Sequence, residues 1–197
     1  KFGEKHQLNR VTVKELIALA RARPGQINIA SAGSGSPSHL GGALFSYLAK
    51  IDAVHVPYKG APPALTDLIS GQVDLYVSGL PPALAMMKAG RVKGIAVTTL
   101  TRAQAAPQVP TFSESGLHGY DVTLWYGLLA PAGVAPAILG RLNSEAVKAL
   151  GAQDVRQRHA SHAVDSTSST QPQFAALISS EIQRWANLVK AAGIRVE

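Results

Sequence analysis

The chain has 197 residues, of which 46% are hydrophobic and 16% are charged, with no long polar or single-residue tract. This composition indicates a globular protein and argues against an intrinsically disordered one. The absence of cysteine excludes disulfides, thiolate metal sites and cysteine nucleophiles. The net charge of +7 favours an anionic partner. The basic residues are scattered, however, and no aromatic ladder accompanies them, so we expect no nucleic-acid partner.

Short apolar runs alternate with helical patterns through the first two thirds of the chain. The capping box Thr12-Val-Lys-Glu15 begins the first helix, and Pro24-Gly25 ends it. In chain order the predicted elements are helix 12–22, strand 27–30, helix 37–49, strand 53–56, helix 62–70, strand 73–77, helix 81–89 and strand 93–98. Strands that alternate with helices predict an α/β fold with a largely parallel sheet flanked by helices.

The pattern changes after Thr98. It predicts a loop over 101–109, a short capped helix at 111–114 and a long strand over 121–130. Three helices are predicted beyond that point, over 135–150, 154–160 and 171–192, so the C-terminal tail is mainly helical. Pro131 and Gly133 limit continued strand pairing, and we therefore expect the chain to cross between two lobes near 125–133.

The most informative segment is the strand-to-helix turn Ser31-Ala-Gly-Ser-Gly-Ser-Pro-Ser38. Its glycines allow the backbone to approach a ligand closely, and the free amides at the start of the next helix point outward with the positive end of the helix dipole. Serine hydroxyls add further donors. The turn therefore predicts an anion-binding cradle made of Ser31, Ala32, Gly33, Ser34, Gly35, Ser36, Ser38 and His39. The alternative interpretation is a tight structural turn with a serine helix cap.

Two further turns follow neighbouring predicted strands and belong at the same edge of the sheet, because crossovers between parallel strands are right-handed. One contains Tyr58, Lys59 and Gly60, and the other contains Ser78 and Gly79. Open parallel sheets bind ligands outside the carboxyl ends of their strands, so these residues are further candidates for the ligand site. Lys59 is the only cation in the three turns. Alternatively, Lys59 is simply exposed and Tyr58 simply packs against its neighbours.

Catalytic and metal sites receive little support from the residues. Ser36 and His39 face similarly, but no acid is placed to orient the histidine, and Gly33-Ser-Gly35 is too short for a nucleophile elbow. His159 and His162 are three apart but lack a third metal ligand. The Ser31–Ser38 turn also lacks the endings of phosphate-binding and dinucleotide-binding loops. We therefore predict a protein that is not an enzyme and that uses no metal or cofactor.

Seven motifs occur in order along the chain: TVKELIALARARPG at 12–25, the turn at 31–40, HVPYKGAPPALTDL at 55–68, GQVD at 71–74, PQVPT at 107–111, WYGLLAPAG at 125–133 and AGI at 192–194. With this ordered set the chain resembles the Bug-type receptors of tripartite tricarboxylate transporters, which are periplasmic solute-binding proteins. The resemblance implies a bilobal, type II-like periplasmic-binding fold that closes on its ligand like a hinge. It also implies that backbone amides and small hydroxyls of two facing loops hold the ligand carboxylate, and the Ser31–Ser38 turn matches one of these loops.

The other loop of such receptors is a Pro-Gly-Gly-rich turn that belongs to the first lobe, and this sequence contains no stretch that resembles it. The implied division is a poorly matching segment at 1–11, the ligand-binding second lobe at 12–124, and a hinge strand with a C-terminal segment at 125–197 that returns to the first lobe. We expect that segment to pack on the second lobe or, in a homodimer, on another copy of the chain. The expected function is a periplasmic receptor that captures a small carboxylate for a membrane permease. A small-molecule sensing module and a serine hydrolase are the alternatives.

Overall fold

The computed structural model describes residues 11–194, and the contacts within it divide the chain into two compact units. The first unit contains the residues up to Leu124 together with those from Leu188 onward, and the second is Trp125–Asn187. The predicted segment 125–197 is therefore shared between the two units, and the predicted segment 1–11 lies outside the described residues except for Val11. Within residues 11–194, no helix is both long enough and apolar enough to span a membrane.

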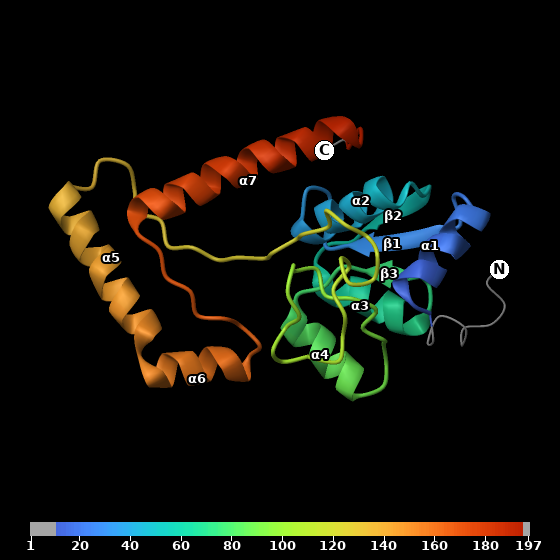
Figure 1. Ribbon diagram of the computed structural model, residues 1–197, viewed down its shortest axis with the longest axis horizontal. Helices are drawn as coiled ribbons and strands as arrows, with labels where there is room; N and C mark the ends of the chain where they lie inside the picture. The colour runs from blue at the N-terminus through green and yellow to red at the C-terminus, as the bar shows by residue number, and fades with distance from the viewer. Residues whose placement is uncertain (1–10, 195–197) are drawn as a thin grey trace. The chain divides into compact units, whose positions relative to one another are not determined.

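A three-stranded parallel sheet forms the centre of the first unit. Strands β1 (Ile27–Ser31), β2 (Ala53–Pro57) and β3 (Leu75–Tyr76) lie in the order β2-β1-β3, as Figure 1 shows. In the register of the sheet, Ile29 of β1 is aligned with His55 of β2 and with Leu75 of β3. This sheet confirms the predicted α/β fold with parallel strands.

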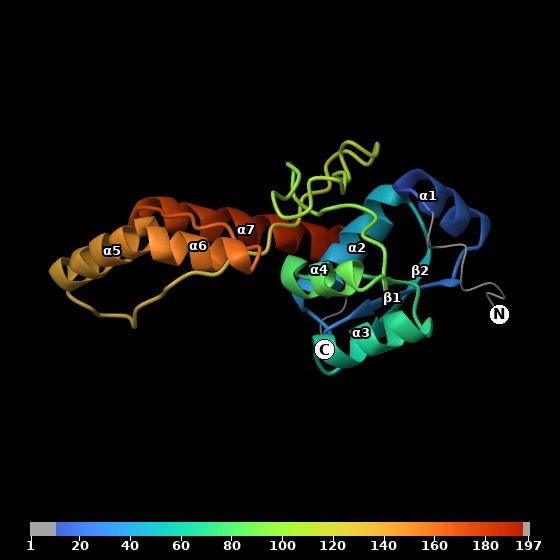
Figure 2. The same cartoon turned by 90° about the horizontal axis from the view of Figure 1, so that it is seen from below.

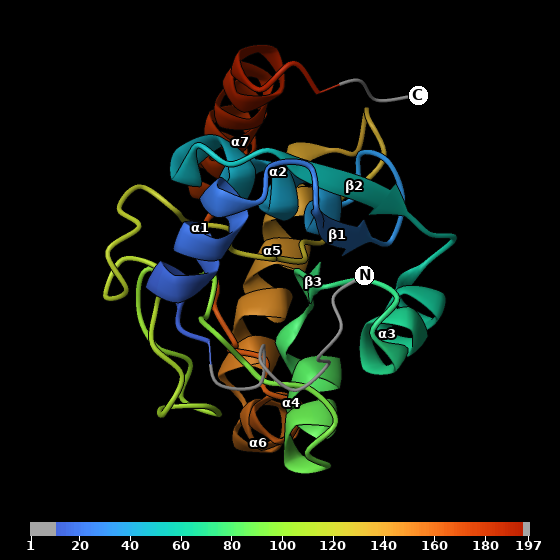
Figure 3. The ribbon, with the colours of Figure 1, turned by 90° about the vertical axis from the view of Figure 1, so that its right-hand side faces the viewer.

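Helices cover both faces of the sheet. Figures 2 and 3 show α1 (Val13–Ala22) and α2 (Pro37–Ala49) on one side of the strands and α3 (Ala61–Ser70) on the other. The two faces follow from the alternation of side chains along β1. Ile29 packs against Gly42 of α2, whereas its neighbour Ala30 is buried in a cluster with Ala64 of α3. The sheet is thus wound on both sides, with β1 at its centre.

The ends of the helices follow from local sequence signals. In the α1 capping box, the Thr12 N–H donates to Glu15 Oε2 at 2.7 Å and the Glu15 N–H donates to Thr12 Oγ1 at 3.3 Å. Ser36 caps α2, and Gly71 ends α3 in the left-handed conformation. The remaining helices are α4 (Leu80–Lys88), α5 (Pro136–Gly151), α6 (Gln153–Ser161) and α7 (Gln171–Ala191). Every predicted helix except 111–114, and the first two predicted strands, begin and end within one residue of the prediction.

Two predicted strands are wrong. The 93–98 segment contributes only an isolated bridge between Val97 and Thr111, and the 121–130 segment forms no strand. A strand requires a hydrogen-bonded neighbour as well as a suitable sequence. Val122 has such a neighbour in Thr98, to whose carbonyl its N–H donates at 2.8 Å, but no backbone hydrogen bond joins residues 123–130 to any other described segment. The predicted strand 73–77 is also shorter in the structure.

The predicted short helix at 111–114 is a turn, although its capping bonds form. The Thr111 N–H donates to Glu114 Oε2 at 2.8 Å, and the Glu114 N–H donates to Thr111 Oγ1 at 3.0 Å. Arg102 also donates from Nε to both Glu114 carboxylate oxygens. One helical turn forms, in which the Ser115 N–H donates to the Thr111 carbonyl. It ends at once, because Gly116 has a φ of +92° and the Leu117 N–H returns to the Phe112 carbonyl.

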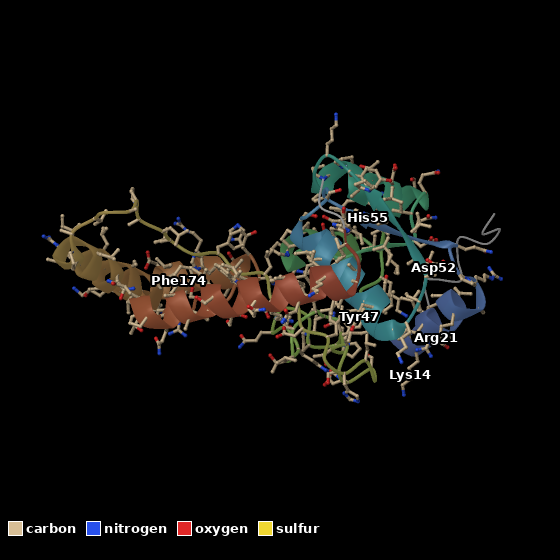
Figure 4. All side chains as sticks on the ribbon, turned by 90° about the horizontal axis from the view of Figure 1, so that it is seen from above. Lys14, Arg21, Tyr47, Asp52, His55 and Phe174 are labelled. Carbon is tan, nitrogen blue, oxygen red and sulfur yellow. The ribbon has the colours of Figure 1, made fainter. Side chains whose placement is uncertain are left out.

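The second unit contains α5, α6 and most of α7, joined to an extended segment that begins at Trp125. Phe174 of α7, labelled in Figure 4, meets the Trp125 ring edge-on with 5.5 Å between ring centroids. Tyr126, Leu128 and Leu129 are 84%, 83% and 79% exposed. Packing of this C-terminal part on another copy of the chain stays a prediction.

A candidate anion site at the start of helix α2

The three predicted ligand turns lie at one edge of the sheet, because all three strands are parallel and end there. The first two turns are hydrogen-bonded to each other: the Tyr58 N–H donates to the Ser31 carbonyl and the Gly60 N–H donates to the Ala32 carbonyl, both at 3.0 Å. On the other side, the Ser38 hydroxyl contacts the Tyr76 phenol at the end of β3. The predicted convergence of the three turns is confirmed, whereas their role in binding stays a prediction.

The ends of β1 and β3 flank a topological switch point of the sheet. Helix α2 connects β1 to β2 on one face of the sheet, and α3 connects β2 to β3 on the other face. Open α/β sheets bind ligands at such a point, outside the carboxyl ends of the strands. The helices that begin at this edge are α2, α3 and α4, so the positive ends of three helix dipoles gather there.

The three turns carry no negative side chain that would reduce the positive potential of the helix dipoles. The sequence has no Asp or Glu at 31–38, 57–61 or 77–81. Lys59 is exposed and forms no ion pair with another described residue. The three turns therefore contribute backbone dipoles and one lysine to the electrostatics of the edge. Such an environment favours an anion over a cation.

Three of the four predicted serine hydroxyls are used inside the protein. The Ser31 side chain is fully buried, and its Oγ accepts the Gly33 N–H at 3.2 Å. Ser36 Oγ donates to the Gly33 carbonyl at 2.6 Å, and Ser38 Oγ accepts the Ala32 N–H at 2.9 Å. These hydroxyls build the turn rather than face a ligand. Ser34 is the exception, because it is exposed and its hydroxyl bonds to no described residue.

The backbone amides of the turn also fall into two groups, those that donate within the protein and those that have no internal acceptor. The amides of Ala32, Gly33, Gly35 and Ser36 all donate to acceptors within the turn or the first turn of α2. The amides of Ser34 and Ser38 donate to no acceptor among residues 11–194. The donors left for a ligand in this turn are therefore two backbone N–H groups and the Ser34 hydroxyl, a set suited to the oxygens of a carboxylate.

Glycine is required at two positions of the turn. Gly33 has a φ of +134° and Gly35 has a φ of +75°, values that side-chain-bearing residues rarely adopt. A Cβ on Gly33 would also lie 3.3 Å from the Tyr58 carbonyl oxygen, at the point where the first two turns meet. These glycines permit the chain to reverse and present the Ser34 amide.

Two stacked histidines lie beneath the turn. The rings of His39 on α2 and His55 on β2 are nearly parallel, with 3.8 Å between centroids. The Gly35 N–H donates to His39 Nδ1 at 3.0 Å, and Ser31 Oγ lies 2.7 Å from His55 Nε2. Burial lowers the pKa of both histidines, and the adjacent His39 lowers that of His55 further. Both shifts favour the neutral form of the pair.

Sequence reasoning assigned neither His55 nor Tyr76 to the site. The available signal was positional: both residues lie in strands that end at the edge where the turns gather. His55 is on the same face of the sheet as Ile29, which packs on α2. Such a position predicts contact with the first turn of α2, where His39 lies.

A pocket of about 380 Å³ gives access to the histidine pair from the side of β2. Tyr47 of α2 and His55 of β2, both labelled in Figure 4, line it together with Ala191 and Ala192 at the end of α7. His39 also lines this pocket. The histidine rings thus line the pocket and also bond the turn, and Ser38 of the turn lines the pocket as well.

The other candidate residues have local roles. The Tyr58 hydroxyl donates to Asp67 Oδ2 of α3 at 2.7 Å, and this bond is the main cause of the raised pKa of Tyr58. Its phenol is thus directed to α3. Ser78 Oγ donates to the Gly79 carbonyl at 3.0 Å, just before α4 begins. The position of Gly60 in the site is set by its hydrogen bond to Ala32.

Ser36 and His39 do not form the nucleophile and base that the hydrolase hypothesis requires. The contact between these residues runs from the His39 backbone N–H to Ser36 Oγ, and the His39 ring nitrogen Nδ1 already accepts the Gly35 N–H. Ser31 does meet His55, but it is fully buried. No group of three or more potential metal ligands occurs within residues 11–194.

A doubly wound parallel sheet whose three candidate ligand turns gather at its switch point is typical of one lobe of a solute-binding protein. Residues 7–194 match the model of the tripartite tricarboxylate transporter family receptor, and the chain belongs to this family. It is 36% identical over 178 residues to a protein of Pseudomonas sp. strain P51 encoded in the tcbD-tcbE intergenic region. It is 32% identical over 182 residues to BugT of Bordetella pertussis. These matches confirm the resemblance to Bug-type receptors.

Solved structures support the same assignment. The protein Rpa4515 of R. palustris, determined with adipate, has a TM-score of 0.86 and 31% identity over 96% of this chain. MatC of Rhodopseudomonas palustris, determined with bound malate, has a TM-score of 0.78 and 32% identity over 93% of this chain. The chain covers 63% of each of these structures, and 53% and 56% of the Pseudomonas and Bordetella relatives. It thus spans little more than half the length of these curated relatives.

Proposed function

We propose that the chain contributes one ligand-binding lobe of an extracytoplasmic receptor that binds a small carboxylate and delivers it to a membrane permease. The observation that carries the proposal is the pair of unpartnered amides, Ser34 and Ser38, at the start of α2. They lie at a switch point where three helices begin, and the three turns themselves contain no Asp or Glu. The family and the adipate and malate complexes of two related proteins support the same ligand class.

The proposed protein binds without catalysing a reaction. The donors proposed for the ligand are two backbone amides and the Ser34 hydroxyl, and Ser36 and His39 do not form a nucleophile and base pair. Family membership supports a periplasmic location and a permease partner. A small-molecule sensor would use the same lobe, so binding alone does not distinguish a sensor from a transport receptor. A transport experiment with the permease does, because a sensor would bind the carboxylate without supplying it for transport.

Calorimetry with a panel of carboxylates tests the proposal. Malate, adipate and succinate are titrated into the 197-residue chain, and the diamide of succinate serves as a neutral isostere. We expect at least one carboxylate to bind and to raise the melting temperature, because a ligand that binds only the folded state stabilises it. If no member of the panel binds, or if the diamide binds as well as succinate, the anion-binding proposal is wrong.

A matched pair of variants locates the binding to α2. Ser34→Glu places a tethered carboxylate beside the free amides, and Gln72→Glu makes a similar charge change at an exposed residue after α3, at the other end of that helix. We expect Ser34→Glu to weaken binding by at least about tenfold, because like charges in one site repel. The folded state should keep its stability, since an acid near a helix start is favourable. Equal weakening by both variants would point to net charge rather than to this site.

A further inference from the structure

We propose that neutral His39 is a positioning residue of the carboxylate site: its Nδ1 lone pair holds the Gly35 amide, and His55 holds the His39 ring in place. This inference rests on the proposed function for its ligand, while its geometry is independent of it. His39 itself touches the turn rather than the ligand. It acts through Gly35. This residue lies between Ser34, which has a free amide, and Ser36, which is the N-cap of α2.

The hydrogen-bond pattern assigns the proton on His39. Nδ1 accepts the Gly35 N–H at 3.0 Å, so it carries no proton, and the neutral ring must carry its proton on Nε2. An imidazolium would present N–H to N–H and break this bond. The Gly35 amide is thereby turned inward, while the Ser34 amide one residue earlier has no internal acceptor. The histidine bond thus decides which amide of the turn remains for a ligand.

His55 restrains the ring from the sheet side. Its ring stacks on His39 with an interplanar angle of 6°, and its Nε2 is 2.7 Å from Ser31 Oγ. Ser31 in turn bonds the Gly33 amide. The two histidines therefore hold alternate amides of the turn, Gly35 directly and Gly33 through Ser31. Stacking at 3.8 Å also disfavours a charge on either ring, because two imidazolium ions would repel at that distance.

Among the described residues that line the pocket, no other group supplies a competing charge to the histidine pair. Besides the two histidines, Tyr47 is the one titratable residue among those described that line the pocket. Tyr76 reaches the first turn of α2 from β3 through Ser38. The end of α7 contributes Ala191, Ala192 and Ile194. Because these neighbours are neutral, the acceptor on His39 is set by the hydrogen bond to Gly35 and by burial.

Two substitutions at one position separate this role from simple packing. In His39→Asn, the Oδ1 atom stands where Nδ1 stands and can accept the Gly35 N–H without a titratable ring. In His39→Leu, a side chain of similar size fills the site without an acceptor. We expect His39→Leu to weaken succinate binding about fivefold, the factor that loss of one net hydrogen bond produces. We expect His39→Asn to keep the affinity within about twofold of the original chain.

Stability is expected to rank the two variants in the opposite order. Leu suits the buried site and Asn loses the stacked ring, so His39→Leu should unfold at the higher temperature of the two. A merely structural histidine would make affinity follow stability, and this result would overturn the proposal. His118→Leu is the control, because His118 is an exposed histidine of the first unit that bonds Ser113 rather than the turn.

Nitrogen NMR of the ligand-free chain tests the inference without any carboxylate. The imidazole ¹⁵N shifts should identify Nδ1 of His39 as the unprotonated nitrogen, and the Gly35 amide proton should titrate together with the His39 ring. A proton on Nδ1, or a Gly35 amide indifferent to His39 titration, would refute the positioning role even if succinate binds. Absence of succinate binding with the expected spectra would instead refute the proposed function alone.

Discussion

The packing of α2 on the sheet can be tested by adding one methyl group. Gly42→Ala would place a Cβ 2.9 Å from Ile29 Cγ2, although carbon atoms in contact prefer about 3.5 to 4.0 Å. Ile29 is buried in the central strand, and its β-branched side chain has little rotamer freedom. We therefore take the upper part of the usual overpacking cost, about 3 kcal/mol. Alanine regains about 1 kcal/mol of helix propensity, which leaves a net destabilisation of about 2 kcal/mol.

Gly140→Ala is the matched control, because Gly140 is also inside a helix but a Cβ there would meet no atom within 4 Å. It should stabilise its helix by up to about 1 kcal/mol. Urea unfolding is followed separately for each unit, by NMR amide signals of β1 for the first and by tryptophan fluorescence for the second, since Trp125 and Trp185 are both there. If Gly42→Ala is neutral or stabilising like Gly140→Ala, the close contact between α2 and β1 is not real.

Three further outcomes follow from the same geometry. Burial keeps the folded-state pKa of His39 and His55 low, so below about pH 6.5 the unfolded chain binds more protons than the folded chain. The free energy of unfolding should therefore decrease as the pH falls. Thermal unfolding at pH 7.5 and pH 5 should show this decrease, and a His39→Asn/His55→Gln variant should show a smaller one. Gly33→Ala forces a side chain into a left-handed conformation against the second turn, and should cost about 1 to 3 kcal/mol and weaken carboxylate binding, whereas Gly119→Ala, at a φ of +80° with open space around it, should lower stability alone. Tyr58→Phe removes the hydrogen bond to the α3 carboxylate and should cost about 1 kcal/mol in denaturant unfolding without changing carboxylate affinity; a lost affinity would place its hydroxyl in the site.

The sequence predicted the first unit well where local signals determine structure. Caps such as Thr12 with Glu15, Pro37 inside the first turn of α2, and Gly71 after α3 fixed the helix ends. The alternation of strands and helices then led to the parallel sheet and to the edge where the turns gather. These features depend on neighbours within a few residues, which a single sequence displays directly.

Features that depend on distant partners were missed. The apolar pattern of 121–130 was sufficient to predict a strand, but pairing requires a neighbouring strand, and Trp125 to Ala130 have none among the described residues. The roles of the serines were also out of reach, because Ser31 and Ser34 look alike in sequence while one is fully buried and the other is exposed. The His39 and His55 stack joins a helix to a strand and leaves no spacing signal.

Amide NMR during a succinate titration can show whether the start of α2 holds a carboxylate. With the ¹⁵N-labelled chain, we predict that the largest shifts occur at the Ser34 and Ser38 amides, whose N–H groups have no internal acceptor among residues 11–194. Succinamide at the same concentrations should leave both signals in place. Saturable shifts centred on other residues, or none at any succinate concentration, would contradict the assignment of the start of α2 as the carboxylate grip.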